Sequence, residues 1–168
     1  MKLRSATAIA LVATFLCSQV SAATWYGFNK ILTDKDMYYF DRDTVIKTSI
    51  STTLWVKVVT DTTQEQKDGI YSMALKYLYN CNALTLQVLS SASYDKAGKF
   101  INSFNEPRIA QNIIPGSIGE DLLKAVCAPD FPKSKSRDVY FPLEGSDLFE
   151  NTNQYFEYSR SRVDPAPK

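Results

Sequence analysis

Alternating apolar and polar positions in the first part of the chain predict β-strands. In residues 53–60, Leu54, Val56 and Val58 form an apolar face and alternate with mixed positions that include Trp55. A period of two is typical of a strand with one face against a core. Similar apolar or aromatic runs between turn signals predict about six strands, at residues 24–30, 37–40, 53–60, 72–81, 84–94 and 99–104.

Polar segments with glycine separate the later strands. Residues 61–69 are polar and end in Asp-Gly, which predicts an exposed loop. Residues 95–98 (Asp-Lys-Ala-Gly) predict a tight hairpin in which Gly98 takes the left-handed conformation.

One helix follows the strands. Pro115-Gly116 interrupts the chain, Ser117 is a suitable N-cap, and Glu120 stands three residues later, so that the two side chains form a capping box. A single face of this helix collects apolar side chains at helical spacing, namely Ile118, Leu122, Leu123, Val126 and Cys127.

The composition changes after Cys127. Residues 128–168 hold five of the chain's seven prolines. A second helix is expected after Ser146, because apolar residues recur there at helical spacing, and packing on the sheet is favoured over packing on a partner. Lys133, Lys135 and Arg137 form a small basic cluster that could contact an acidic partner, although a solvated loop is the favoured interpretation.

The start of the chain has the three parts of a secretory signal. Lys2 and Arg4 supply positive charge, residues 6–16 are short and mostly apolar, and small residues lead to a cleavage site between Ala22 and Ala23. Lipid attachment at Cys17 is disfavoured, because bulky residues precede it. We therefore expect a signal peptide at 1–22, an α+β domain at 23–127 and an extension at 128–168, exported to the periplasm or the outer surface of a Gram-negative bacterium.

Charge and length exclude several classes of partner. Without residues 1–22 the chain has 17 basic and 18 acidic residues, a net charge of −1. No global field then attracts nucleic acid or an anionic membrane. No apolar run is long enough to form a transmembrane helix.

The chain contains no histidine. The usual general base, the Ser-His-Asp and Cys-His arrangements, and imidazole zinc sites are therefore excluded. Carboxylate, tyrosine or lysine chemistry would remain, but scattered acidic residues give that possibility little specificity. We expect a protein that is not an enzyme, with no catalytic residue, metal or cofactor.

Two cysteines, Cys81 and Cys127, remain after the signal peptide. An isolated pair in an oxidising compartment usually forms a disulfide, and two free thiols are the alternative. Each cysteine continues the apolar face of its predicted strand or helix, so a bridge would tie the helix to the sheet.

Several separated motifs resemble the surface-adhesin protein E family of Gram-negative bacteria. Trp25 precedes Tyr-Tyr-Phe-Asp at 38–41; after Cys81, Tyr-Asp-x-x-Gly-Lys at 94–99 and Ile-Pro-Gly-Ser-x-Gly-Glu at 114–120 lead to Cys127. The resemblance covers about residues 24–127. It implies an antiparallel sheet with a helix packed across it and disulfide-linked to it, a possible homodimer, and a role in binding host matrix or serum proteins.

Two classes of function follow. The leading hypothesis is a binding module that holds a protein partner, and exposed aromatic residues on the sheet face away from the helix would support it. The alternative is a periplasmic accessory, structural or inhibitor protein with no host ligand. A small-molecule carrier and a carboxylate hydrolase rank below both.

Overall fold

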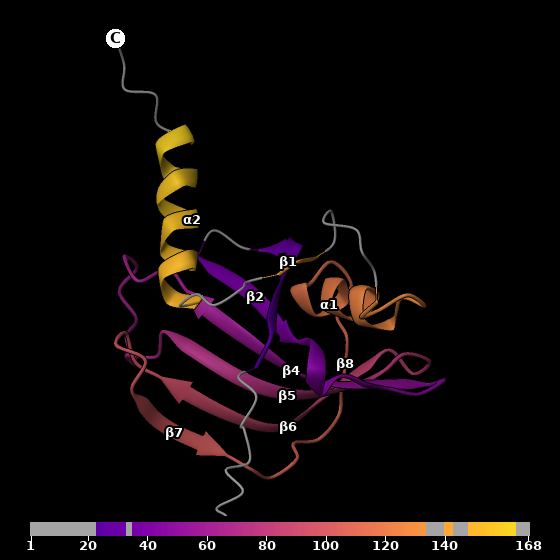
Figure 1. The fold of residues 1–168 in the computed structure, drawn as a ribbon. Helices are drawn as coiled ribbons and strands as arrows, with labels where there is room; N and C mark the ends of the chain where they lie inside the picture. The colour runs from indigo at the N-terminus through magenta and orange to yellow at the C-terminus, as the bar shows by residue number, and fades with distance from the viewer. Residues whose placement is uncertain (1–22, 33–34, 134–139, 143–147, 164–168) are drawn as a thin grey trace, which may run out of the picture.

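The computed structural model describes residues 23–32, 35–133, 140–142 and 148–163. It is an α+β fold in which an antiparallel sheet carries two α-helices (Figure 1). The nine described strands are β1 Trp25–Leu32, β2 Asp36–Asp41, β3 Ile46–Lys47, β4 Ser51–Thr60, β5 Ser72–Asn80, β6 Thr85–Tyr94, β7 Phe100–Phe104, β8 Gln111–Asn112 and β9 Tyr140–Pro142. The helices are η1 Arg42–Thr44, α1 Ile118–Cys127 and α2 Leu148–Val163.

The sheet follows the order β7-β6-β5-β4-β2-β1-β9, with β3 paired to β4 and β8 paired to β6. The six predicted strands are confirmed as β1, β2, β4, β5, β6 and β7, and their ends differ by a few residues. The short strands β3, β8 and β9 were not predicted, because two or three residues carry no periodicity. They exist through pairing with longer strands, which local sequence does not encode.

The first face of the sheet packs against α1. Alternation along β4 directs its even-numbered apolar residues to this side, where they meet the apolar stripe of α1. The buried residues of this core are Phe28, Phe40, Leu54, Val56, Val58, Tyr79, Leu122, Leu123, Val126 and Phe131.

The start of α1 confirms the predicted cap with one change. Ser117 Oγ accepts a hydrogen bond from the backbone N–H of Glu120 at 3.3 Å. The Glu120 carboxylate accepts from the N–H of Gly116 at 2.7 Å, one residue before the N-cap. Ser117 N–H instead donates to the carbonyl of Ile114, so it does not need the glutamate.

A disulfide joins Cys81 to Cys127, with 5.7 Å between the two Cα atoms. The predicted bridge between helix and sheet is confirmed, and the free-thiol alternative is wrong. Cys81 lies in the turn directly after β5 and not within the strand as expected. The strand ends at Asn80, whose side-chain oxygen accepts from the N–H groups of Asn82 and Ala83 and so starts the turn.

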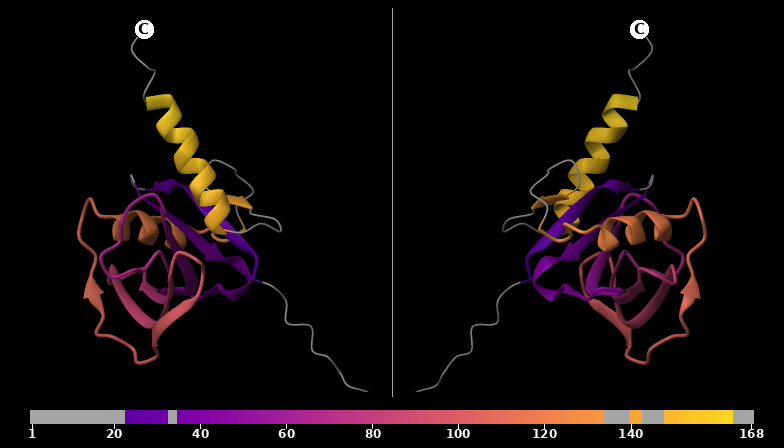
Figure 2. Two further views of the ribbon diagram at one scale, coloured as in Figure 1. Left: turned by 90° about the vertical axis from the view of Figure 1, so that its left-hand side faces the viewer. Right: turned by 90° about the vertical axis from the view of Figure 1, so that its right-hand side faces the viewer.

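The second predicted helix is confirmed as α2, and it packs on the opposite face of the sheet (Figure 2). Its side chains Leu148 and Phe156 are buried against β2 and β4 residues Met37, Tyr39 and Val59. The Tyr39 hydroxyl and Thr152 Oγ1 are hydrogen-bonded at 2.7 Å within this second core. No helix of the described residues is long and apolar enough to cross a membrane.

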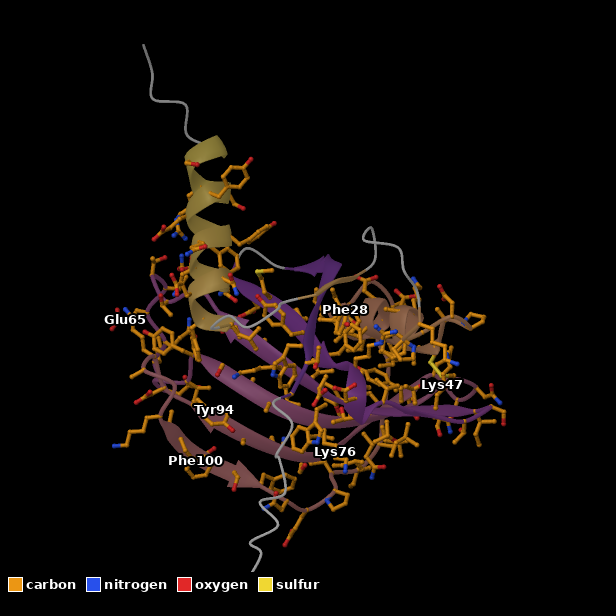
Figure 3. All side chains as sticks on the ribbon, in the orientation of Figure 1. Phe28, Lys47, Glu65, Lys76, Tyr94 and Phe100 are labelled. Atoms are coloured by element: carbon orange, nitrogen blue, oxygen red, sulfur yellow. A yellow bond between two sulfur atoms is a disulfide. The ribbon has the colours of Figure 1, made fainter. Side chains whose placement is uncertain are left out.

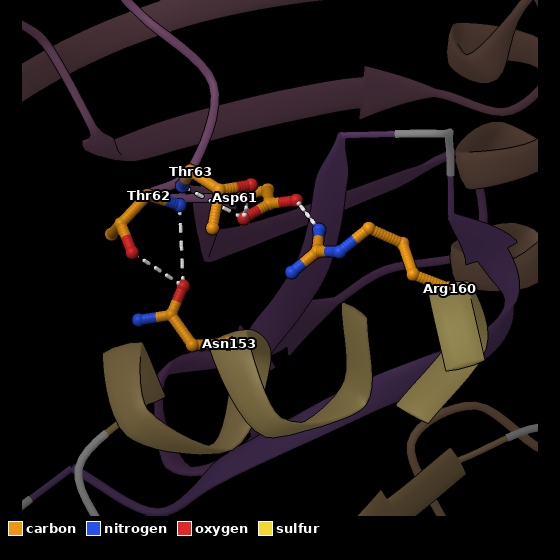
Figure 4. A network of polar contacts seen from close by, with 5 residues as sticks. All are labelled: Asp61, Thr62, Thr63, Asn153 and Arg160. Carbon is orange, nitrogen blue, oxygen red and sulfur yellow. Dashed lines mark hydrogen bonds and ion pairs between the residues drawn. The ribbon is translucent and has the colours of Figure 1, made fainter. Parts of the chain in front are cut away.

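A polar network holds α2 to the loop after β4 (Figure 4). Asp61 is fully buried, accepts from the N–H and hydroxyl of Thr63 at 2.9 Å each, and forms an ion pair with Arg160. Asn153 accepts from the N–H and hydroxyl of Thr62 at 3.2 and 2.8 Å. Burial raises the pKa of Asp61, but these hydrogen bonds and the nearby guanidinium outweigh it and lower the pKa overall.

This network predicts a pH dependence of α2 docking. A lowered pKa in the folded state stabilises the fold above the unfolded-state pKa of about 4, and the contribution disappears as the pH falls through the folded-state value. We expect Asp61→Asn to lower the free energy of unfolding at pH 7 by about 2 kcal/mol, mainly through the buried hydrogen bonds, since the Arg160 side chain is 44% exposed. Urea titrations between pH 3 and 7 measure how the free energy of unfolding falls with pH. This fall should be shallower in Asp61→Asn than in the exposed control Asp68→Asn. Equal slopes would contradict the assignment.

Candidate functional site

A shallow, open hollow of about 310 Å³ lies on the α2 side of the sheet, where α2 does not cover it. Its walls are the half-buried aromatic side chains of three strands, β1, β4 and β6, and its floor is made of two alanines. We call it the aromatic hollow. Its lining residues are Trp25, Asp41, Thr44, Trp55, Ala74, Ala92 and Tyr94.

The register of the sheet builds the floor of the aromatic hollow. Lys57, Ala74 and Ala92 are directly opposite one another across β4, β5 and β6, so they form one row. Trp55 and Tyr94 stand two residues from members of this row, and residues two apart in a strand share a face. The small alanine side chains between larger rings leave the depression.

A lysine lies among the aromatic rings at this site. The ammonium of Lys57 is 5.5 Å from the ring centre of Tyr94, 5.6 Å from that of Phe149 and 6.0 Å from that of Trp25. Cation–π attraction holds a lysine over such rings at these distances. Phe149 belongs to α2, so the lysine joins the aromatic hollow to the start of that helix.

The aromatic hollow continues to the end of the sheet. Tyr94 packs edge-on against Phe100 of β7, with ring centres 6.2 Å apart, and Figure 3 shows the two rings near the ends of β6 and β7. Phe100 is 54% exposed. An aromatic surface therefore extends from Trp25 on β1 to Phe100 on β7.

The polar groups at the rim of the aromatic hollow form hydrogen bonds within the chain. Thr44 Oγ1 donates to the carbonyl of Asp41 at 2.8 Å and accepts from the N–H of Trp55 at 3.2 Å. One carboxylate oxygen of Asp41 accepts from the N–H of Asp43 at 3.1 Å. Burial raises the pKa of Asp41, the Asp43 N–H partly offsets this, and the Asp43 charge adds to it. These contacts fix the short 3-10 helix η1 beside Trp55.

The aromatic hollow is suited to recognition by contact. It offers mainly aromatic faces, and the polar groups that line it, Asp41 and Thr44, form hydrogen bonds within the chain. The described residues contain no group of three or more acidic, cysteine or histidine side chains that could hold a metal ion.

The sequence profile of a family described as "Surface-adhesin protein E" matches residues 25–128, from β1 to just past α1. The chain belongs to the surface-adhesin protein E family. The family name describes adhesion, which is binding to another molecule. The expected fold of the family, a sheet with a disulfide-linked helix, agrees with the structure described above.

Two solved structures of Haemophilus influenzae protein E resemble this surface-adhesin E chain. The first is 16% identical in sequence, with a TM-score of 0.41. The matched region covers 59% of this chain and 82% of that protein E chain. The second, from non-typeable Haemophilus influenzae, shares 12% identity at a TM-score of 0.41 and covers 79% of this chain and 89% of its own. A comparison with curated proteins found no match.

None of the described residues predicted as sites lines the aromatic hollow of this surface-adhesin E protein. Lys133 is exposed in a turn near the end of α1, while Lys135 and Arg137 lie outside the described residues, so the basic cluster stays a prediction. Ala23 is exposed at the start of the described chain, and Ala22 and the signal segment lie outside it.

Sequence reasoning missed the aromatic hollow itself. One signal was present, since Trp55 and Lys57 occupy the mixed face of the alternating segment 53–60. A tryptophan on the face of a strand that points away from the main core is a candidate contact residue. The other two aromatic walls, Trp25 and Tyr94, could not be predicted from the sequence. Only the order of strands in the sheet brings them to the same face as Trp55.

Proposed function

We propose that this protein is an exported binding module that holds a protein partner at the aromatic hollow. The observation that carries the proposal is the group of half-buried aromatic side chains on the sheet face opposite α1. Membership of the surface-adhesin protein E family supports a binding role. A host matrix or serum protein is the proposed partner if the protein is displayed on the cell surface.

The shape of the aromatic hollow favours a protein over a small molecule. Small-molecule sites enclose most of their ligand, whereas this depression is shallow and open. Tryptophan and tyrosine are the residues that most often dominate protein interfaces, because they bury much area at a low entropic cost.

Substitution of Trp55 tests the proposal. We expect Trp55→Ala in the chain from residue 23 to weaken binding in a panel of purified matrix and serum proteins at least about tenfold, as for a central interface residue. The matched control is Ile109→Ala, which removes an apolar side chain that is 88% exposed elsewhere. Biolayer interferometry measures both. Binding that both variants retain would place the contact surface elsewhere.

Export is part of the proposal and needs its own experiment. Cell fractionation with protease treatment of intact cells, followed with an antibody to residues 23–168, separates the two compartments. Loss of the protein from intact cells supports surface display and adhesion. Protection until the outer membrane is opened supports the periplasmic accessory role, and the search for a partner then moves inside the cell envelope.

A further inference from the structure

A second hollow, of about 230 Å³, lies on the opposite side of the sheet, beside α1. We call it the Leu84 hollow. Three segments of the chain supply its walls: the turn after β5, the segment after β8, and α1. Its lining residues are Leu84, Ile113, Pro115, Glu120, Leu123 and Lys124.

Leu84 has a backbone conformation that its side chain disfavours. Its φ is +53°, and it is the only non-glycine residue with positive φ in the described chain. The other positive-φ positions there are Gly69, Gly98 and Gly116. A branched side chain in the left-handed region is strained, and glycine or asparagine is the usual choice in such a turn.

Burial within the fold does not explain this leucine. Its side chain is 55% exposed, so it gains only part of the free energy that a buried leucine would contribute. Its backbone is held without help from the side chain, because the Leu84 carbonyl accepts from the N–H of Ile113 at 3.0 Å. Residues in sparsely populated backbone conformations cluster at active sites, ligand clamps and switch regions.

The walls of the Leu84 hollow are rigidly connected. The disulfide joins Cys81, three residues before Leu84, to the last residue of α1. The cap on Ser117 fixes the other end of the same helix. A hollow that is already formed costs little to fill, because few groups are ordered on binding.

The chemistry of the Leu84 hollow indicates its occupant. Its volume lies below that of typical small-molecule sites and suits a single large side chain. The charged residues at its rim, Glu120 and Lys124, form an ion pair with each other at 2.9 Å, so the site has no unmatched charge. An anionic lipid surface would instead require an excess of basic residues.

We infer that the Leu84 hollow is a docking point for one uncharged apolar side chain, aromatic or aliphatic, of a protein partner. Leu84 is 55% exposed and lines the hollow, so part of its side chain is available to such a partner. The Leu84 hollow lies on the opposite face of the sheet from the aromatic hollow. The inference therefore does not depend on the binding proposed for the aromatic hollow.

The test uses blocked amino acids as probes. In NMR titrations of the labelled chain from residue 23, N-acetyl-phenylalanine amide and N-acetyl-leucine amide should shift the methyl signals of Leu84, Ile113 and Leu123, with saturation at roughly millimolar concentrations. N-acetyl-aspartate amide should leave these signals unchanged. Shifts spread over the whole surface, or equal shifts with the acidic probe, would overturn the inference.

The variant Leu84→Asn separates contact from folding, because asparagine accepts the left-handed conformation. We expect it to raise the melting temperature by about 2–4 °C and to weaken probe binding at least about fivefold. Ile109→Asn, the control at another exposed isoleucine, should leave probe binding unchanged. A lowered melting temperature in Leu84→Asn would show that the leucine serves the fold, and the inference would fail.

The remaining alternative is that a second copy of this chain occupies the Leu84 hollow. Sedimentation velocity of the unmodified chain, compared with Leu84→Asn, distinguishes a second copy from a different protein. A dimer that Leu84→Asn abolishes would identify the occupant as another copy of this chain and overturn the proposal of a separate partner.

Discussion

Removal of the disulfide through the double variant Cys81→Ala/Cys127→Ala should lower the free energy of unfolding by about 4 kcal/mol. The two cysteines are 46 residues apart in the sequence, so the bridge closes a long loop and restricts the unfolded chain strongly. It also joins the last residue of α1 to the turn directly after β5. Urea unfolding followed by circular dichroism measures the difference.

Reduction of the unmodified protein is the matched control. The free energy of unfolding in the presence of reductant should agree with that of the double variant, because both lack the same covalent link. The double variant itself should not respond to reductant. A loss below about 1 kcal/mol would mean that noncovalent packing of Leu122 and Val126 alone holds α1 in place.

Truncation of Phe40 should have an effect of similar size. Its side chain is fully buried at the centre of the first core, with ring centres 4.9 Å from Phe28, 5.0 Å from Phe131 and 5.5 Å from Tyr26. Phe40→Ala removes most of the ring and leaves a cavity whose walls come from separate segments and cannot close together. We expect a loss of about 4 kcal/mol in the free energy of unfolding.

Phe40→Leu is the control for the volume effect, since it keeps most of the apolar contact. It should cost roughly 1–2 kcal/mol, which is well below the cost of the alanine variant. Both values come from chemical denaturation at constant pH. Equal losses in the two variants would indicate that aromatic contact, and not the filled volume, stabilises this part of the core.

The strands and helices were predictable because their signals are local. The alternation in β4, the turn at Gly98 and the cap at Ser117 each lie within a few residues of the element that they define. The disulfide was predictable for another reason, since only one pair of cysteines remains after the expected signal peptide.

The candidate sites were not predictable, because they depend on contacts between distant segments. Trp25 and Tyr94 line one hollow only because β2, β4 and β5 lie between their strands in the observed order. The sequence around Leu84 likewise contains no glycine that would mark a left-handed residue. Hydrophobic patterns locate the core, but they do not say which partly exposed side chains share a surface.

The region shared with the family and the region that forms the cores do not have the same boundaries. The family match ends at residue 128, yet α2, which lies wholly beyond it, covers Met37, Tyr39 and Val59. A chain shortened to the matched region would expose this apolar surface and leave the buried Tyr39 hydroxyl without Thr152. The family match therefore covers only part of the chain that the second core requires.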